Sequence, residues 1–84
     1  MNPRVKEVKP IARYKLLLTF TNNEKKVFDV KPYLSLGVFK ELEDIKVFNS
    51  VRAKDGTVQW NNGIDICPDT LFIESIAYSP ESTA

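Results

Sequence analysis

The sequence predicts a small α+β domain: an antiparallel or mixed sheet of two hairpin-meander units, with about six short strands, and two or three short helices packed on one face. Two observations support this. The 84 residues suffice for one domain with a modest core. Apolar residues alternate with period two in two regions rich in turn residues, and stretches of helical spacing adjoin both. We expect a single domain over residues 1–78 and a disordered polar tail over residues 79–84.

The first unit begins with an edge strand at residues 4–9, because Pro10 cannot donate a hydrogen bond within the centre of a sheet. Residues 14–21 are the clearest strand. Its apolar face carries Tyr14, Leu16, Leu18 and Phe20. Leu17 indicates that the opposite face is also partly covered. An odd-length turn around residues 22–24 then leads into a return strand at residues 25–30, which pairs Leu18 with Phe28 and Leu16 with Val30.

Residues 31–49 change to helical spacing, and Gly37 interrupts it. We therefore expect short helical segments rather than one long helix, lying across the covered face of the sheet. The side chains expected to point inward are Phe39, Leu42, Ile45 and Phe48.

The second unit is a meander with strands at residues 51–54, 57–60 and 64–66. Asp55-Gly56 is a strong signal for a two-residue hairpin loop. With a two-residue loop at the next turn, the two isoleucines that follow it would lie on the other face of the sheet from Trp60. A three-residue loop, residues 61–63, instead puts the apolar side chains on one face, as burial requires. The resulting pairs are Trp60 with Ile64 and Val58 with Ile66.

Gly63 supplies the positive φ that ends such a loop without a Cβ penalty. Pro68 suits the first turn of a following helix, where its missing N–H costs nothing. The apolar stripe of that helix is expected to contain Leu71, Phe72, Ser75 and Ile76.

Composition narrows the possible chemistry. The chain has one cysteine and no histidine, which removes the internal disulfide, the commonest general base and the commonest metal ligand. No apolar run approaches the ~20 residues of a membrane span, and the N-terminus lacks the apolar segment of a signal peptide. We expect a cytoplasmic protein without cofactor or metal. A basic face with exposed aromatic residues is also missing, so nucleic-acid binding is not expected of this domain alone.

Charge is unevenly distributed along the chain. Residues 1–31 carry eight basic and three acidic residues, a net charge of +5, whereas residues 32–84 carry four and eight, a net charge of −4. The favoured interpretation is that the two halves mingle on one surface. The alternative is a dipolar surface that binds an acidic partner or forms a twofold homodimer, with the basic edge strand against the acidic helical region.

Residues 60–72, Trp-Asn-Asn-Gly-Ile-Asp-Ile-Cys-Pro-Asp-Thr-Leu-Phe, resemble a bacterial family known as domain of unknown function 2442. The family typically has Trp, a short Asn/Gly turn, Ala-Asp-Leu or similar, Pro-Asp and Leu-Tyr. Ile64 stands where a smaller residue is usual, Phe72 replaces the Tyr, and Asn22-Asn23 lacks the family's Gly. The resemblance extends over residues 4–78 and implies a small α+β domain, found alone or ahead of a helix-turn-helix domain, with no established activity.

All of the candidate functional positions belong to this motif. They are Trp60, Asn62, Gly63, Asp65, Cys67, Pro68 and Asp69. No catalytic residue is assigned, and we expect a non-catalytic protein-interaction or regulatory module whose partner is another protein or a second copy. The alternative is a small enzyme or ligand-binding domain that uses Asp65, Cys67 and Asp69, with Cys67 activated at a helix N-terminus. Trp60 is expected in the core rather than in an exposed aromatic platform with Tyr33.

Overall fold

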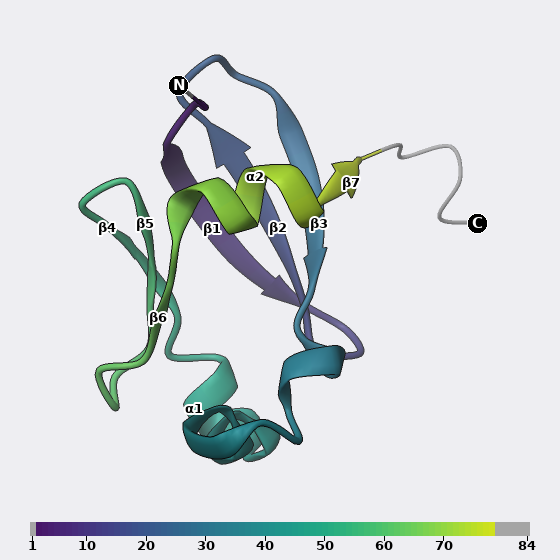
Figure 1. Cartoon of the computed structure of the whole chain (residues 1–84), viewed down its shortest axis with the longest axis vertical. Helices are drawn as coiled ribbons and strands as arrows, with labels where there is room; N and C mark the ends of the chain where they lie inside the picture. The colour runs from purple at the N-terminus through teal and green to yellow at the C-terminus, as the bar shows by residue number, and fades with distance from the viewer. Residues whose placement is uncertain (1, 79–84) are drawn as a thin grey trace.

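Seven short strands form two antiparallel sheets in the computed structural model, which describes residues 2–78 (Figure 1). The first sheet has the order β1 (Val5–Ile11), β2 (Lys15–Phe20), β3 (Lys25–Asp29) and β7 (Ile76–Ala77). The second has the order β4 (Arg52–Lys54), β5 (Thr57–Gln59) and β6 (Asp65–Ile66). The predicted α+β class is confirmed, with one strand more than expected. The tail predicted at residues 79–84 lies outside the described residues.

Four short helical elements complete the fold: η1 (Lys31–Tyr33), η2 (Gly37–Glu43), α1 (Ile45–Phe48) and α2 (Pro68–Glu74). Helix α2 crosses one face of the four-stranded sheet in Figure 1, whereas η1, η2 and α1 lie together below the strands in that view. The predicted series of short helices between β3 and β4 is confirmed, but these helices lie at the ends of the strands rather than across a face of the sheet (Figure 1). None of the helices described within residues 2–78 combines the length and the apolar character that crossing a bilayer requires.

One apolar core joins the two sheets, α1 and α2. It contains the side chains that β2 and β3 direct toward α2, together with the buried apolar side chains of the second sheet. Its largest members, each fully buried, are Trp60, Phe20, Phe28, Phe48, Leu16, Leu18, Leu42 and Leu71. Phe72 of α2 packs edge-on against Phe20, with ring centroids 5.0 Å apart. We call this side of the four-stranded sheet its inner face and the opposite side its outer face.

The second sheet has the predicted register. Ala53 pairs with Val58, and Val58 pairs with Ile66. The backbone N–H of Trp60 donates to the carbonyl of Ile64 at 2.9 Å. Two turns of different length therefore keep the apolar side chains of this meander on one buried face.

The predicted register of β2 and β3 is wrong by two residues. Leu16, not Leu18, pairs with Phe28, and Leu18 pairs with Lys26. The loop has the expected odd length, but it lies one residue earlier in the chain, at residues 21–23, because the N–H of Phe20 already bonds to the carbonyl of Glu24. Asn23 permits this turn by adopting a φ of +69°, a conformation that asparagine tolerates better than most residues. A shift of two residues leaves each side chain on its predicted face.

Three further predictions about the ends of elements are corrected. Strand β1 continues through Pro10 to Ile11, which is possible because β1 is the edge of its sheet. Ile45 is 51% exposed, because α1 is a single turn that directs Phe48 into the core. Helix α2 ends at Glu74, so Ile76 leaves the helix and joins β7, where it is 70% exposed.

Candidate functional site

The loop between β5 and β6 is fixed by its own polar groups. Gly63 has a φ of +89°, and its N–H donates to the carbonyl of Trp60 at 3.0 Å. The side-chain oxygen of Asn62 accepts from the N–H of Ile64 at 3.2 Å, while its amide nitrogen donates to Glu41 at 3.0 Å. Asn62 therefore both shapes the turn and ties it to η2, a structural role that its place in the motif did not reveal.

Trp60 lies in the core, as predicted. Its side chain is 1% exposed, and the indole N–H donates to the carbonyl of Phe48 at 3.0 Å. The Phe48 ring lies beside it, with ring centroids 6.4 Å apart. Trp60 thus joins the second sheet to α1 and is not available as an exposed binding platform.

Tyr33, the other aromatic residue considered for such a platform, packs on the opposite part of the core. Its ring stacks on Phe28 at 5.6 Å between centroids. The Tyr33 hydroxyl donates to Glu74 at 2.5 Å. This hydrogen bond to Glu74, followed by burial and by the negative charge of the same carboxylate, raises the pKa of Tyr33 to about 12. The contact fastens η1 to the end of α2.

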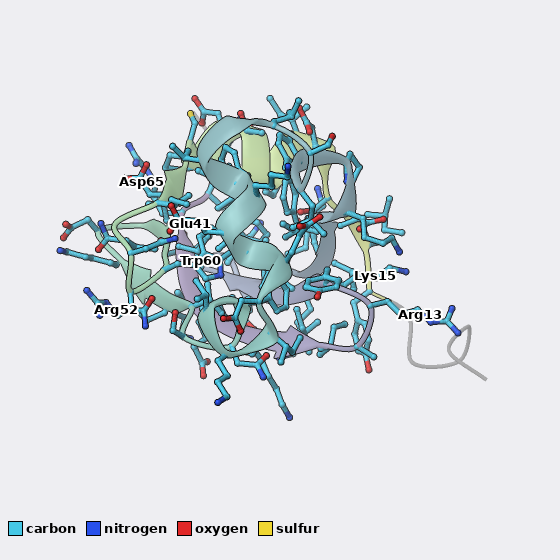
Figure 2. All side chains as sticks on the ribbon, turned by 90° about the horizontal axis from the view of Figure 1, so that it is seen from below. Arg13, Lys15, Glu41, Arg52, Trp60 and Asp65 are labelled. Atoms are coloured by element: carbon cyan, nitrogen blue, oxygen red, sulfur yellow. The ribbon has the colours of Figure 1, made fainter. Side chains whose placement is uncertain are left out.

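Asp65 is exposed on β6 and pairs with Gln59 of β5. It lines a shallow depression of about 150 Å³ on the outward side of the second sheet. The other residues that line the depression are Lys54, Asp55, Thr57 and Gln59. Figure 2 shows Arg52 and Asp65 toward one side of the molecule, with Arg13 and Lys15 toward the opposite side.

Cys67, Pro68 and Asp69 form the start of α2, as predicted. Cys67 is the exposed N-cap residue, but its side chain makes no capping hydrogen bond. Pro68 occupies the first turn, and Asp69 is the acidic residue of that turn. The Asp69 carboxylate accepts from the side chain of Asn2 at 3.4 Å. Neither Cys67 nor Asp69 lines the depression beside Asp65, and the described residues contain no cluster of three metal-ligating side chains.

Sequence reasoning missed an apolar row on the outer face of the four-stranded sheet. The register aligns Leu17 of β2, Val27 of β3 and Ile76 of β7 across three neighbouring strands. Ile11 of β1 lies on the same face, one row away. None of these four residues belongs to the core or to the apolar side chains packed against it. Leu17 and Val27 are half-buried on this face, whereas α2 packs on the opposite, inner face.

Charged residues of both signs surround this row. Lys9 of β1 continues it at the edge, and Lys15 pairs with Asp29 in the next row. The Asp29 carboxylate accepts from the N–H of Lys31 at 2.9 Å and lies 3.6 Å from its ammonium group. Asp29 thus closes the turn that leads from β3 into η1. The outward positions of β2 and β3 were readable in the sequence, but the contribution of Ile76 was not, because β7 was predicted as helix.

Comparison with protein families gives a match over residues 5–77 to a family described as a protein of unknown function, DUF2442. Comparison with curated proteins and with solved structures gives no match. The matched range contains both sheets, and it includes the motif at residues 60–72 that carries the resemblance in the sequence. The chain therefore belongs to the DUF2442 family of proteins of unknown function.

Proposed function

We propose that this domain is a non-catalytic, cytoplasmic protein-interaction module that binds its partner through the outer face of the four-stranded sheet. The observation that carries the proposal is the row of Leu17, Val27 and Ile76, which lies outside the core. Ile76 alone is 70% exposed. Apolar area removed from water contributes about 25 cal/mol per Å², so covering such a row favours association.

The rigidity of this surface distinguishes it from the other exposed apolar residues. Leu36, Val38, Ile45 and Ile73 are also exposed, but they lie in or beside the short helices η2, α1 and α2. The outer face is supported instead by four hydrogen-bonded strands. A preorganised surface loses less conformational entropy on binding and retains more of the energy of its contacts. The outer face is therefore a better docking surface than the exposed residues of the short helices.

The charges on this face favour a protein over a nucleic acid. Lys9, Lys15 and Lys25 point outward, but so do Glu7 and Asp29 in the same rows. Two carboxylates would repel a phosphate backbone, whereas interspersed charges of both signs complement a protein surface with its own mixed charges.

Affinity capture from the cytosol of the native host tests this function. Leu17→Glu places a charge in the centre of the row, and Val38→Glu makes the same kind of change at a residue that is 63% exposed on η2. We expect the unaltered domain and Val38→Glu to retain the same partner, and Leu17→Glu to lose it while keeping its far-UV circular dichroism spectrum. Equal capture by all three proteins would contradict the proposal.

The depression beside Asp65 supports a second candidate function, the binding of a small polar ligand. Its volume of about 150 Å³ is below the ~300–1,000 Å³ of ordinary ligand pockets, so a ligand would be small. Cys67 lies outside the depression, and the enzymatic alternative requires it to be reactive. Alkylation of Cys67 no faster than that of an unstructured cysteine peptide would leave that alternative without its nucleophile.

A further inference from the structure

We infer that the partner is a second copy of this chain, docked outer face to outer face about a twofold axis that runs parallel to the strands. This inference rests on the proposed function, because it uses the same surface. It differs from the dimer expected from charge distribution along the chain, which set a basic edge against the acidic helical region.

The outer face consists of three rows that cross the strands in the order β1, β2, β3 and β7. The central row is Lys9, Leu17, Val27 and Ile76. On one side of it lies the row of Ile11, Lys15 and Asp29. On the other side lie Glu7, Thr19 and Lys25, and Tyr78 extends this row because its N–H donates to the carbonyl of Lys25 at 3.0 Å.

The twofold axis runs parallel to the strands, midway between β2 and β3 and midway between the two facing sheets. Rotation about it places β2 of each copy over β3 of the other. Leu17 of each copy then faces Val27 of the other, so the apolar centre of the interface is formed twice. Lys15 of each copy likewise faces Asp29 of the other, and Lys25 faces Thr19. The contact is self-complementary in both apolar and charged groups, and a twofold arrangement closes at a dimer.

Asp29 is prepared for such an ion pair. One carboxylate oxygen accepts from the Lys31 N–H at 2.9 Å, and the other lies 3.6 Å from the Lys31 ammonium group, so the orientation of the carboxylate is fixed. The side chain remains 42% exposed. Little further ordering of Asp29 is needed when the Lys15 ammonium group of a second copy approaches, so less entropy is lost than for two mobile side chains.

A twofold axis perpendicular to the strands would serve less well. It would place the central row of one copy opposite the central row of the other, so that Lys9 faces Lys9 of the other copy. The two outer rows would face each other. Lys25 would then face Asp29, but the like charges at the edge would oppose association. The axis parallel to the strands instead sets Lys9 over Ile76, where the lysine stem can cover the exposed isoleucine.

The size of the face sets the strength of the dimer. Four strands spaced about 4.8 Å apart, with five residues at about 3.4 Å each, give a face of about 19 by 17 Å, roughly 300 Å² in projection. A standard interface buries about 800 Å² of accessible surface on each partner. An interface well below the standard size is typical of a weak association, so the dimer is expected to form only at high protein concentration, on the order of 100 µM.

Sedimentation equilibrium between about 10 µM and 1 mM tests this inference with a charge exchange. Lys15→Glu and Asp29→Lys each place like charges opposite each other, and we expect each to raise the dissociation constant at least about tenfold. The double variant restores opposite charges, and its dissociation constant returns to within about threefold of the unaltered chain. Lys40→Glu, on η2, is the matched control and leaves association unchanged.

Several results would overturn the inference. They are a monomer at 1 mM, single variants that associate normally, or a folded double variant as weak as the singles. Circular dichroism confirms folding, which matters for Asp29→Lys because Asp29 also caps the backbone of Lys31. If the chain is monomeric but Leu17→Glu abolishes capture of a host protein, the second copy is the wrong partner and the proposed function stands. If capture is also unaffected, both are wrong.

Discussion

Replacement of Trp60 by alanine removes the side chain that links the second sheet to α1. Trp60 is 1% exposed, and its indole N–H donates to the Phe48 carbonyl at 3.0 Å. Truncation of a buried tryptophan costs about 3–5 kcal/mol of unfolding free energy. A domain of 84 residues, at about 0.05–0.15 kcal/mol per residue, has roughly 4–13 kcal/mol in all. Trp60→Ala is therefore expected to remove about 3–5 kcal/mol of that stability, which unfolds the domain at the low end of the range.

Trp60→Phe separates the hydrogen bond from the packing. Phenylalanine keeps most of the apolar contact but leaves the Phe48 carbonyl without its donor, a loss of about 1–3 kcal/mol. Urea denaturation followed by far-UV circular dichroism suits both variants, because each removes the only tryptophan of the chain. A Trp60→Ala protein within about 1 kcal/mol of the unaltered chain would refute the placement of Trp60 in the core.

Two further perturbations have outcomes that follow from local geometry. Gly63→Ala is expected to lower the unfolding free energy by roughly 1 kcal/mol, since φ is +89° but a Cβ there meets no atom within 4 Å; an unchanged denaturation midpoint would contradict this. In the native state Glu74 raises the pKa of Tyr33 to about 12, whereas the Tyr33 hydroxyl of the unfolded chain ionises near pH 10. The contribution of Tyr33 to stability is therefore lost as the pH rises from about 10 to about 12. Tyr33→Phe is expected to lose less stability over that range, and parallel losses would count against the Tyr33–Glu74 contact.

Turn chemistry explains why the second meander could be predicted from the sequence. Asp55-Gly56 and Gly63 each specify a loop length, and only one register keeps Trp60 and Val58 on the same face as their partners. The turn between β2 and β3 lacks glycine, and Asn23 adopts the positive φ instead. Asparagine is a weaker signal for that conformation than glycine, so the position of the three-residue loop, and with it the register, could not be fixed.

Tertiary pairing explains the error at the end of α2. Helical spacing places Ile76 on the stripe of Leu71 and Phe72, but the chain becomes extended at Ser75 and pairs with Val27 of β3. Nothing in the local sequence requires that ending, because it depends on an open strand edge far away in the chain. The same error concealed the outer-face row, since Leu17 and Val27 become part of a continuous apolar surface only when β7 is added.

Most of the residues that the motif at residues 60–72 marks as candidates stabilise the fold. Trp60 is core, Asn62 ties the loop to Glu41, and Pro68 begins α2. Asp65 lies on the surface of the second sheet, apart from the outer face of the first. A motif can identify a family by the residues that its fold requires, and these need not be the residues through which the protein acts.

The most direct test of the outer face as the interaction surface is a dilution series of the unaltered chain followed by methyl and amide NMR. Between about 1 mM and about 10 µM, a range that brackets the affinity expected of so small an interface, we predict shifts or broadening at Leu17, Val27 and Ile76. Val38 and Ile45, which are 63% and 51% exposed and lie on η2 and α1, should stay unchanged. Perturbation confined to Val38 and Ile45, with the outer face unaffected, would contradict the account.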